Sequence, residues 1–213
     1  MTPETPHLVY FADPMCSWCY GFAPVMGRIA AEYGARLPIR LIMGGLRAYN
    51  TIPMSERDKE YIRGAWTRVG AASGQPFDFD FFEREGFVYD TEPACRAIVV
   101  MRRRAPGQAL AFKARISRAF YAEGQDVTRA DVLAGLAAEL GEDRAAFALD
   151  LGSQAAREQT ARDFAIAKTT GVDGFPMLLA GSEANGFEVI SAGFQPAEPV
   201  LARLADWADA TAM

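Results

Sequence analysis

Two cysteines, Cys16 and Cys19, lie three residues apart at the junction between a predicted strand and a predicted helix. Residues 7–12 have the β-branched and aromatic composition of a short strand. Residues 23–33 then place apolar side chains at helical spacing. Cysteines three apart in the first turn of a helix lie on one face, within the Cα separation of ~4.4–6.8 Å that a disulfide requires. The junction therefore predicts a dithiol pair that can open and close a disulfide reversibly.

The two cysteines are expected to have different roles. Cys16 comes first and would lie beside unpaired backbone N–H groups and the positive end of the helix dipole, both of which favour a thiolate over a thiol. Cys19 lies one turn further in and is better shielded from solvent. We therefore expect Cys16 to be the nucleophile and Cys19 to be the resolving thiol that attacks a mixed disulfide.

Other uses of a cysteine pair are disfavoured by the rest of the sequence. Zinc takes four ligands, but no second cysteine pair exists, and the only histidine, His7, is at the start of the preceding strand. No metal site is therefore expected. The interpretation that both cysteines are buried residues without a chemical role is disfavoured, because they lie directly between a strand and a helix. A Cys–His hydrolase would have to use His7, and no asparagine or aspartate pattern supports it.

The composition argues against several partners. The 22 basic and 27 acidic residues give a formal net charge of −5, so the chain lacks the cationic field that attracts nucleic acid or anionic lipid. No apolar stretch approaches the ~20 residues that cross a bilayer. The first seven residues contain no basic segment followed by an apolar run, so we expect no secretory signal and a cytoplasmic protein. In a reducing compartment, three cysteines indicate catalytic or incidental roles rather than a structural disulfide framework.

The remaining predicted strands lie near the two ends of the chain. Residues 37–43 form a second β-rich run after the helix, and the strand–helix–strand order predicts a parallel βαβ unit. Near the other end, residues 176–180 and 187–191 are typical of the strands of an antiparallel hairpin. Residues 196–210 place apolar side chains at helical spacings and predict a closing amphipathic helix.

Between these parts the pattern changes to alanine, leucine, arginine and glutamate at helical periods. Helices are predicted at residues 55–72, 92–104, 109–122, 128–140 and 153–170. The predicted fold class is therefore α/β, with residues 1–53 and 168–213 forming one discontinuous unit and residues 54–167 forming a large all-helical insertion. The aromatic run at residues 77–82 is predicted to pack the helices onto the rest of the chain rather than to contact a substrate.

A second chemical feature is Gly174-Phe175-Pro176, directly before the β-run at residues 176–180. A peptide bond that precedes proline is a candidate for the cis form, which costs only ~0.5–1 kcal/mol there. A cis bond would expose the backbone of Phe175 to an extended substrate segment, which could pair with it as an added strand. An ordinary trans proline at the start of a strand is the alternative that the local sequence leaves open.

Together these segments resemble the DsbA-like branch of the thioredoxin superfamily, and more closely its cytoplasmic members described as predicted protein-disulfide isomerases. The resemblance rests on residues 13–22 (DPMCSWCYGF), 91–97 (TEPACRA) and 171–177 (GVDGFPM). It implies a thioredoxin fold with a helical insertion, a catalytic first cysteine, a resolving second cysteine and a cis-proline loop. These features correspond to Cys16, Cys19 and Pro176, and the resemblance favours the cis form at Pro176.

The chain departs from the secreted DsbA enzymes between its cysteines, where it has Ser17-Trp18 rather than Pro-His. Without an imidazolium beside the thiolate, the pKa of Cys16 should be less depressed than in those enzymes. We therefore predict a reductase or isomerase rather than a strong oxidant, acting on protein disulfides or on small-molecule disulfides and thiols. No bound cofactor is expected because the disulfide is itself the redox group, and an external thiol such as glutathione is a candidate donor.

Two other functions remain as alternatives. Kappa-class glutathione transferases and chromene-carboxylate isomerases share the expected fold, but they typically have a serine at the place of Cys16 and need no resolving thiol. The presence of Cys19 therefore favours redox chemistry. A binding module that holds extended peptides or a metal without turnover is the other alternative. Neither the natural substrate nor the oligomeric state follows from the sequence.

Three further residues are candidates for supporting roles. Asp13 could accept a proton during resolution, but an Asp-Pro pair also starts turns, and we favour the turn. Cys95 lies in an apolar helical stretch and is expected to be a small buried residue rather than a third redox thiol. Trp18, between the cysteines, is expected to be exposed and to contact substrate together with Phe175 and Pro176.

Overall fold

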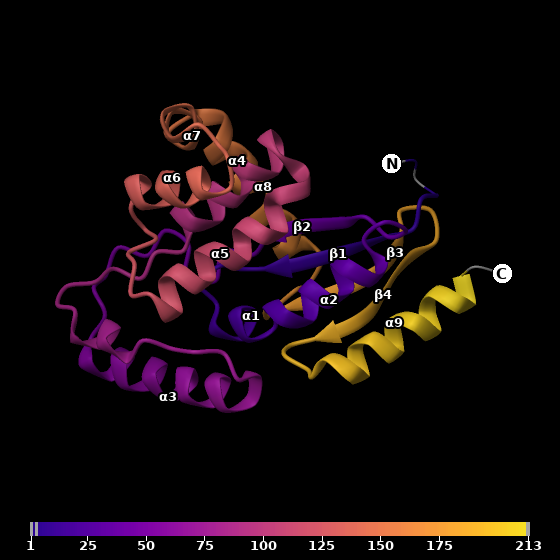
Figure 1. Cartoon of the computed structure of the whole chain (residues 1–213), viewed down its shortest axis with the longest axis horizontal. Coiled ribbons are helices and arrows are strands. Elements are labelled where there is room, and N and C mark those ends of the chain that lie inside the picture. The colour runs from indigo at the N-terminus through magenta and orange to yellow at the C-terminus, as the bar shows by residue number, and fades with distance from the viewer. Residues whose placement is uncertain (1, 3, 212–213) are drawn as a thin grey trace.

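The computed structural model describes residues 2 and 4–211 of the 213-residue chain. Residues 1, 3, 212 and 213, which belong to the predicted discontinuous unit, lie outside the described part, and the division of the chain into two units stays a prediction. The described strands form one four-stranded sheet in the order β2-β1-β3-β4 (Figure 1). They are β1 (His7–Ala12), β2 (Ile39–Met43), β3 (Met177–Ser182) and β4 (Gly186–Ala192).

β1 joins the two halves of the sheet. It pairs in parallel with β2, with Leu8 opposite Ile39, and antiparallel with β3. β3 and β4 form an antiparallel hairpin with a register shift between Leu178 and Leu179. The parallel pair and the hairpin confirm the strand arrangement predicted from the sequence. β1 is therefore an inner strand, and it leads directly into the loop that holds Cys16.

All six residues of β1 are buried because helices cover both faces of the sheet. One face packs against α2 (Ala23–Tyr33) and α9 (Ala197–Thr211), which lie over the strands in Figure 1. The other face, with Val9 and Phe11, packs against α8 (Gln154–Thr169). The side chains of β1 alternate between these faces because a strand has a period of two. The sheet is thus the middle layer of three.

Six α-helices connect β2 to β3 within the described chain. They are α3 (Glu56–Ser73), α4 (Glu92–Arg104), α5 (Ala109–Ala122), α6 (Ala130–Glu139), α7 (Arg144–Leu151) and α8, joined by the short 3₁₀ helices η1 (Phe79–Glu83) and η2 (Pro106–Gln108). The bounds of α4 and α5 agree with the prediction, and those of α3, α6 and α8 differ from it by one or two residues. Helix α7 is not predicted from the sequence, because two turns are too short for a clear helical period. The signal for it is Asp143, whose carboxylate accepts a hydrogen bond from the Ala146 N–H at 2.7 Å.

The helical segment after the cysteines is interrupted at Phe22, where α1 (Ser17–Gly21) ends and α2 begins. A proline within a helix often kinks it, but Pro24 does not lie inside one continuous helix here. Pro24 lies in the first turn of α2, where backbone N–H groups have no partner within the helix and a proline costs little. The interruption leaves α1 as a separate short helix directly after Cys16.

The aromatic run at residues 77–82 packs helices of the predicted insertion against one another, and Phe77 also packs against Tyr20 of α1, with ring centroids 5.3 Å apart, which is a contact with the rest of the chain of the kind predicted. Trp66 of α3 is buried, and its ring centroid lies 5.0 Å from that of Phe81 and 4.7 Å from that of Phe82. The ring of Tyr121 on α5 lies 4.9 Å away on another side of the indole. These contacts join α3 to α5, although α3 extends away from the sheet (Figure 1).

Charged side chains attach the helices to the outer edge of β2. Asp163 of α8 is buried and accepts hydrogen bonds from Nη1 and Nη2 of Arg102 on α4, at 2.8 and 2.9 Å. The same carboxylate accepts a hydrogen bond from the backbone N–H of Met43 at 3.0 Å, and Arg102 donates to the carbonyl of Leu41. These bonds satisfy backbone groups at a sheet edge that no further strand pairs.

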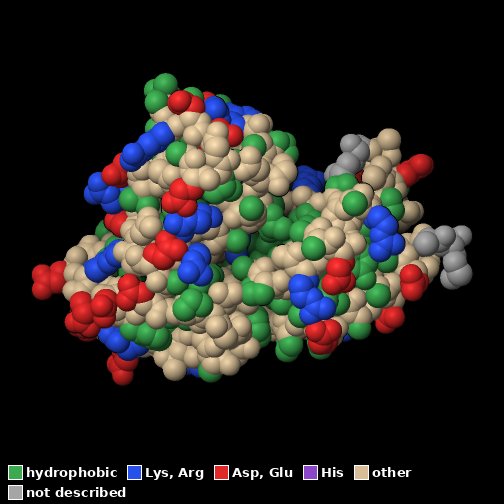
Figure 2. All heavy atoms as spheres, in the orientation of Figure 1, with side chains coloured by type: hydrophobic (Ala, Val, Ile, Leu, Met, Phe, Trp, Pro, Cys, Tyr) green, Lys and Arg blue, Asp and Glu red, His purple; other side chains and the backbone are tan. Residues whose placement is uncertain are grey.

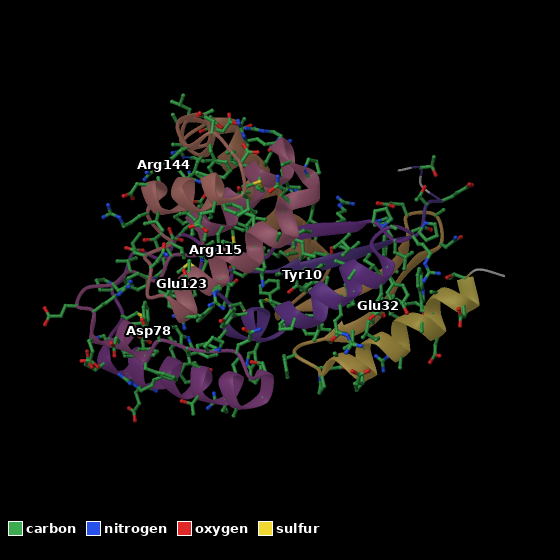
Figure 3. The ribbon with its side chains drawn as sticks, in the orientation of Figure 1. Tyr10, Glu32, Asp78, Arg115, Glu123 and Arg144 are labelled. Atoms are coloured by element: carbon green, nitrogen blue, oxygen red, sulfur yellow. The ribbon has the colours of Figure 1, made fainter. Side chains whose placement is uncertain are left out.

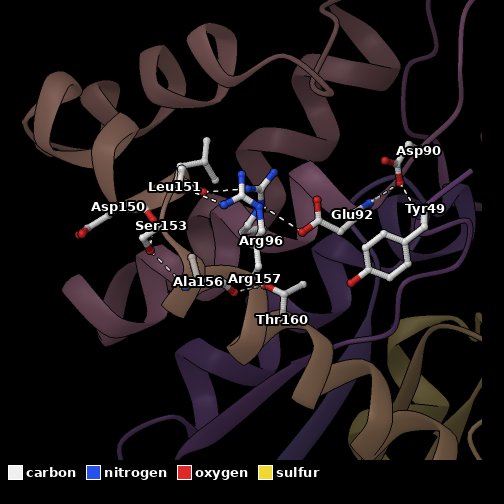
Figure 4. A network of polar contacts seen from close by, with 11 residues as sticks. Tyr49, Asp90, Glu92, Arg96, Asp150, Leu151, Ser153, Ala156, Arg157 and Thr160 are labelled. Atoms are coloured by element: carbon white, nitrogen blue, oxygen red, sulfur yellow. Dashed lines mark hydrogen bonds and ion pairs between the residues drawn. The ribbon is translucent and has the colours of Figure 1, made fainter. Parts of the chain in front are cut away.

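A second polar network joins α4 to the junction between α7 and α8 (Figure 4). Nη1 of Arg96 donates to the carbonyl of Leu151 at 2.9 Å, and its Nε lies 3.1 Å from Oε1 of Glu92. At the same junction, the hydroxyl of Ser153 accepts a hydrogen bond from the Ala156 N–H at 3.1 Å and caps α8. Polar contacts at helix ends therefore supplement the apolar packing of the helical block.

Candidate active site

Cys16 ends the loop that follows β1 and is the N-cap of α1. Its backbone is extended, with φ −94° and ψ 118°, and its carbonyl accepts a hydrogen bond from the Tyr20 N–H at 3.0 Å. The side chain is 5% exposed, and Sγ donates to the carbonyl oxygen of Phe175 at 3.6 Å. Cys19 lies one turn further along α1 and is completely buried. Cys16 is thus the outer thiol and Cys19 the inner one.

The surroundings of the two thiols shift their pKa values in opposite directions. A hydrogen bond with the Cys19 thiol lowers the pKa of Cys16, with help from the Cys19 backbone N–H and the ammonium of Lys113, while burial opposes this shift. Burial raises the pKa of Cys19 well above its ordinary value, and the hydrogen bond and negative charge of Cys16 raise it further. The first proton to leave the pair therefore leaves Cys16, so a thiolate forms at the outer position.

Cys16 faces a loop from the other end of the chain. The Phe175–Pro176 peptide bond in this loop is cis. Pro176 is buried, Phe175 is half-buried, and the carbonyl of Phe175 is the group that Cys16 Sγ approaches. The two residues are 159 positions apart in the chain, and the antiparallel pairing of β1 with β3 brings their segments together.

A cavity of about 510 Å³ opens beside Cys16. Its lining comes from the cysteine loop, the segment after β2, helix α3 and the Phe175 loop, and includes Cys16, Trp18, Leu46, Arg47, Tyr61, Trp66, Arg68, Tyr89 and Phe175. Arg47 and Arg68 form no ion pair with a carboxylate of the described residues, whereas many other arginines of the chain do. Leu46 and Tyr61 are large apolar side chains that are 47% and 70% exposed. The cleft is therefore cationic, with an apolar rim, in a chain of net charge −5.

Trp18 is half-buried, so its predicted exposure is wrong. Its ring packs against that of Phe194, with centroids 5.5 Å apart, in the segment between β4 and α9. This segment comes from the opposite end of the chain, so the local sequence around Trp18 carries no sign of the contact. The indole still lines the cavity beside Cys16, and its predicted contact with substrate stays a prediction.

Asp13 anchors the loop that precedes Cys16. Its buried carboxylate accepts hydrogen bonds from the backbone N–H groups of Met15 at 2.8 Å and Leu46 at 2.7 Å. The bond to Met15 is the turn that the Asp-Pro pair predicts, and the bond to Leu46 ties the loop to the segment after β2. Burial raises the pKa of Asp13 above its ordinary value. A role for Asp13 as proton acceptor stays a prediction.

Cys95 lies beneath this loop, on α4. It is completely buried, and its Sγ donates to Oδ2 of Asp13 at 3.5 Å. Burial raises the pKa of the Cys95 thiol well above its ordinary value, and the charge of Asp13 adds to this effect. These features favour the predicted role of a small buried residue.

Two polar residues that the sequence does not predict as part of the site lie on α5, against the cysteine loop. Nζ of Lys113 donates to the carbonyl of Cys19 at 2.7 Å, and the hydroxyl of Ser117 donates to the carbonyl of Pro14 at 2.8 Å. Lys113 is 1% exposed and Ser117 is completely buried. The available signal is their i, i+4 spacing in the middle of the apolar stripe of this helix, where a lysine is unusual.

Two buried tyrosines, also missed by the sequence analysis, close another side of the site. The hydroxyl of Tyr89 donates to the carbonyl of Met15 at 2.6 Å and lies 3.1 Å from the hydroxyl of Tyr121. Burial raises the pKa of both phenols. The cysteine loop is therefore fixed by contacts from the segment before α4 and from α5.

Within residues 2 and 4–211, no group of three or more histidine, cysteine, aspartate or glutamate side chains is arranged to hold a metal ion. No helix in the described part of the chain combines the length and apolar character needed to cross a bilayer.

The fold and the site have counterparts in known proteins. A family model described as a DSBA-like thioredoxin domain matches residues 7–203. A Nitrosomonas europaea protein of known structure, described as a presumed protein disulfide isomerase, is 37% identical, with a TM-score of 0.90 and coverage of 97% of this chain and 98% of that chain. The cytosolic disulfide reductase DsbM from Pseudomonas aeruginosa is 28% identical, with a TM-score of 0.79 and coverage of 97% and 100%. These matches confirm the predicted resemblance and the predicted fold class.

Curated relatives include ClpXP adapter proteins named SpxH. Those of Halalkalibacterium halodurans and Bacillus subtilis are 27% identical over 173 residues and 26% identical over 179 residues. The alignments cover 79% and 83% of this chain but 56% and 58% of those proteins, so the chain spans less than two thirds of their length. A 2-hydroxychromene-2-carboxylate isomerase is 22% identical, with a TM-score of 0.64 and coverage of 96% of this chain and 94% of that chain, which shows a shared fold alone.

Proposed function

The chain belongs to the DSBA-like thioredoxin domain family, and from this premise we propose that it is a thiol–disulfide oxidoreductase that reduces or isomerises disulfides through Cys16 and Cys19. The relatives described as a cytosolic disulfide reductase and as a presumed disulfide isomerase support a redox enzyme of this broad kind. The observation that carries the proposal is an outer thiol of lowered pKa with a completely buried second thiol one helical turn away.

The first chemical step is attack of the Cys16 thiolate on a substrate disulfide. One substrate sulfur bonds to Cys16, and the other leaves as a thiolate. The Phe175 carbonyl accepts a hydrogen bond from Cys16 Sγ while Cys16 is a thiol, and it becomes available to an N–H group of an extended substrate once Cys16 has lost its proton. The substrate would lie in the 510 Å³ cavity, against Trp18 and Phe175.

The second step is resolution by Cys19. Its thiol must lose a proton before it attacks the Cys16 sulfur and releases the reduced substrate. Burial and the negative charge of the Cys16 thiolate both raise the pKa of Cys19, and the effect of that charge disappears once Cys16 is in a mixed disulfide. Cys19 therefore does not react with reagents in solution while Cys16 is a thiolate. It becomes the resolving thiol once Cys16 has formed the mixed disulfide.

We further propose that glutathione serves as the electron donor. The DsbM structure determined with GSH is 28% identical to this chain, with a TM-score of 0.77. Glutathione carries two carboxylates, and the cavity beside Cys16 offers the guanidinium groups of Arg47 and Arg68. A thiol donor of this kind fits a reductase of the cytoplasm, which is the location we propose.

The proposal is tested with hydroxyethyl disulfide and insulin as substrates and glutathione with glutathione reductase as the donor system. Cys16→Ser should abolish turnover, because no nucleophile remains. Cys19→Ser should lose insulin reduction and accumulate a mixed disulfide between Cys16 and glutathione, visible as an added glutathione mass. Cys95→Ala is the matched control and should retain activity, because that thiol lies outside the disulfide chemistry.

The outcome also separates the alternatives. A glutathione-dependent isomerase or transferase would keep its activity in Cys19→Ser, since it needs no resolving thiol. A module that only binds would bind peptides without reducing either disulfide substrate. Full disulfide reductase activity in Cys16→Ser would contradict the proposal.

A further inference from the structure

Lys113 is a buried cation at the back of the dithiol. It is 1% exposed, and its Nζ donates to the carbonyl of Cys19 at 2.7 Å and lies 6.0 Å from the ring centroid of Tyr10. Within the described chain it forms no ion pair with a carboxylate, whereas the more accessible Lys59 lies 2.9 Å from Glu56. A buried ammonium without an anionic partner is costly, so its charge state must depend on what else in the site is charged.

The groups that face Lys113 are few. β1 contributes Tyr10, the loop after it contributes Asp13, and the cysteine segment contributes Cys16 and Cys19. Burial lowers the pKa of Lys113, and the charges of Cys19, Cys16 and Asp13 oppose this shift. The phenol of Tyr10 stays neutral, because burial raises its pKa well above the ordinary value. Of the negative charges near Lys113, the thiolate is therefore the one that disulfide formation removes.

A second cavity, of about 260 Å³, lies between α2 and α5 and is lined by Tyr10, Lys113 and small residues that include Ala23, Gly27 and Ala114. α2 contributes no titratable side chain to its lining. Figure 3 places Tyr10 between these two helices, and Figure 2 shows the hollow between the helical block and α2, bordered by hydrophobic side chains. Lys113 is therefore almost completely buried but borders a cavity between two helices.

We propose that Lys113 is a redox-linked proton site: its ammonium balances the Cys16 thiolate in the dithiol form, and it gives up a proton when Cys16 and Cys19 close into a disulfide. The inference rests on the proposed dithiol function. It goes beyond that function because it assigns a second proton source in the helical block, outside the cysteine motif.

The proton balance of one turnover follows from these charges. In the reduced enzyme a Cys16 thiolate, a Cys19 thiol and a Lys113 ammonium carry charges that sum to zero, and the charge state of Asp13 does not change during the turnover. Two electrons pass to the substrate, whose S–S bond breaks while the Cys16–Cys19 bond forms. The two substrate thiolates take one proton from Cys19 and one from Lys113, directly or through water. In the oxidised enzyme the disulfide and the neutral amine of Lys113 again carry no charge, and two substrate thiols are released.

A purely structural role for Lys113 is the competing explanation. Its bond to the Cys19 carbonyl caps the short helix α1, and a neutral donor could serve the same purpose. Lys113→Gln keeps a hydrogen-bond donor but removes the charge, whereas Lys113→Arg keeps the charge. If Lys113 only caps helix α1, the Lys113→Gln variant should behave like the wild type. If Lys113 is a redox-linked proton site, Lys113→Gln should raise the pKa of Cys16, and Lys113→Arg should leave it near the wild-type value.

The direct test is a lysine-selective NMR titration of the wild-type protein. The chain has three lysines, Lys59, Lys113 and Lys168, so ¹³C-labelled lysine gives three Cε signals, and Lys113→Arg assigns one by its loss. We expect the pKa of Lys113 to be higher in the dithiol form than in the disulfide form by about one unit or more. Equal titration midpoints of Lys113 in the dithiol and disulfide forms would overturn the proposal.

A proton count in a single turnover with hydroxyethyl disulfide gives a second readout. At a pH above the Cys16 thiol pKa of both proteins and below the pKa of the product thiol, the wild type should exchange no proton with the medium, and Lys113→Gln should take up one. Lys168→Gln, at an exposed position, is the control and should match the wild type. Equal uptake by wild type and Lys113→Gln contradicts the proton site, whereas failure to form a Cys16–Cys19 disulfide contradicts the proposed function instead.

Discussion

Gly44 lies so close to the phenyl ring of Phe175 that a Cβ atom added to the glycine would fall 1.9 Å from Cζ of the ring. Gly44 directly follows β2, and its N–H donates to the carbonyl of Ala12 at 2.9 Å. The absence of a side chain at this position therefore allows the Phe175 loop to approach the end of β1 and Cys16.

We predict that Gly44→Ala displaces Phe175 and lowers kcat/KM for disulfide reduction by about 10- to 100-fold, because misplacement of a substrate-positioning group by about 1 Å has effects of this size. The measurement is steady-state insulin reduction together with thermal unfolding. Gly174→Ala, next to Phe175 but with nothing within 4 Å of the added Cβ, should leave the rate within about twofold. Equal losses in both variants would argue against the close approach as the cause.

Alkylation should distinguish the three thiols. Cys16 should react with iodoacetamide in the native protein with an apparent pKa below that of a free thiol, because the Cys19 thiol and Lys113 stabilise its thiolate. Cys19 and Cys95 are completely buried and should react only after unfolding. Peptide mapping after a short exposure across a pH series checks this. Modification of Cys95 at a rate comparable to that of Cys16 would contradict the structure.

The charge of Asp13 should oppose ionisation of Cys16. Its carboxylate raises the pKa of the Cys16 thiol, so removal of the charge in Asp13→Asn should lower that pKa. Alkylation of Cys16 at a fixed pH below its thiol pKa should then be faster in Asp13→Asn than in the wild type. The rate is corrected for any loss of folded protein. The pH–rate profile of disulfide reduction gives a separate test, since an unchanged profile would exclude Asp13 as the proton acceptor.

The bidentate contact between Arg102 and Asp163 should contribute strongly to stability. In Asp163→Ala the guanidinium and the backbone N–H of Met43 lose their acceptor, and we expect a loss of about 2 kcal/mol or more in the free energy of unfolding. The comparison is Glu198→Ala, which breaks an exposed ion pair with Arg28 and should cost less than about 1 kcal/mol. Denaturant titration of both variants measures the difference, and equal costs would be inconsistent with this account.

Arg47 should strengthen the binding of anionic substrates. Replacement by Gln removes a cleft guanidinium that has no carboxylate partner within the described chain, and KM for glutathione disulfide should rise about 3- to 10-fold, equivalent to about 0.7–1.4 kcal/mol. KM for uncharged hydroxyethyl disulfide should change little. Arg57→Gln, which removes an exposed charge on α3 outside the cleft lining, is the control. A parallel rise in KM for both substrates would indicate a general disturbance of the cleft.

Local patterns in the sequence were sufficient for much of the fold. The strand before Cys16, the helical periods of α3 to α6 and α8 and the hairpin near the end of the chain depend on residues only a few positions apart. The same is true of the three-residue spacing of Cys16 and Cys19, which by itself predicts that a helical turn brings the two thiols to one face. The resemblance to a known family then connected these segments into one fold.

The surroundings of the thiols were decided by tertiary structure. The contacts of Cys16 with Phe175, of Cys19 with Lys113 and of Asp13 with Cys95 join residues 159, 94 and 82 positions apart. No local period encodes such pairs, because they form only when the sheet order and the packing of α4 and α5 bring separate segments together.

The same reason explains the errors of the sequence analysis. Trp18 was expected to be exposed because its own helix offers no packing partner, and Phe194 covers it from the far end of the chain. Lys113 was overlooked because a lysine in an amphipathic helix usually reaches solvent, and only the packing of α5 over α1 and β1 buries it. The sequence thus determined which residues carry the thiol chemistry, and the tertiary structure decided their charge environment, because burial and Coulombic interactions depend on distances through space rather than along the chain.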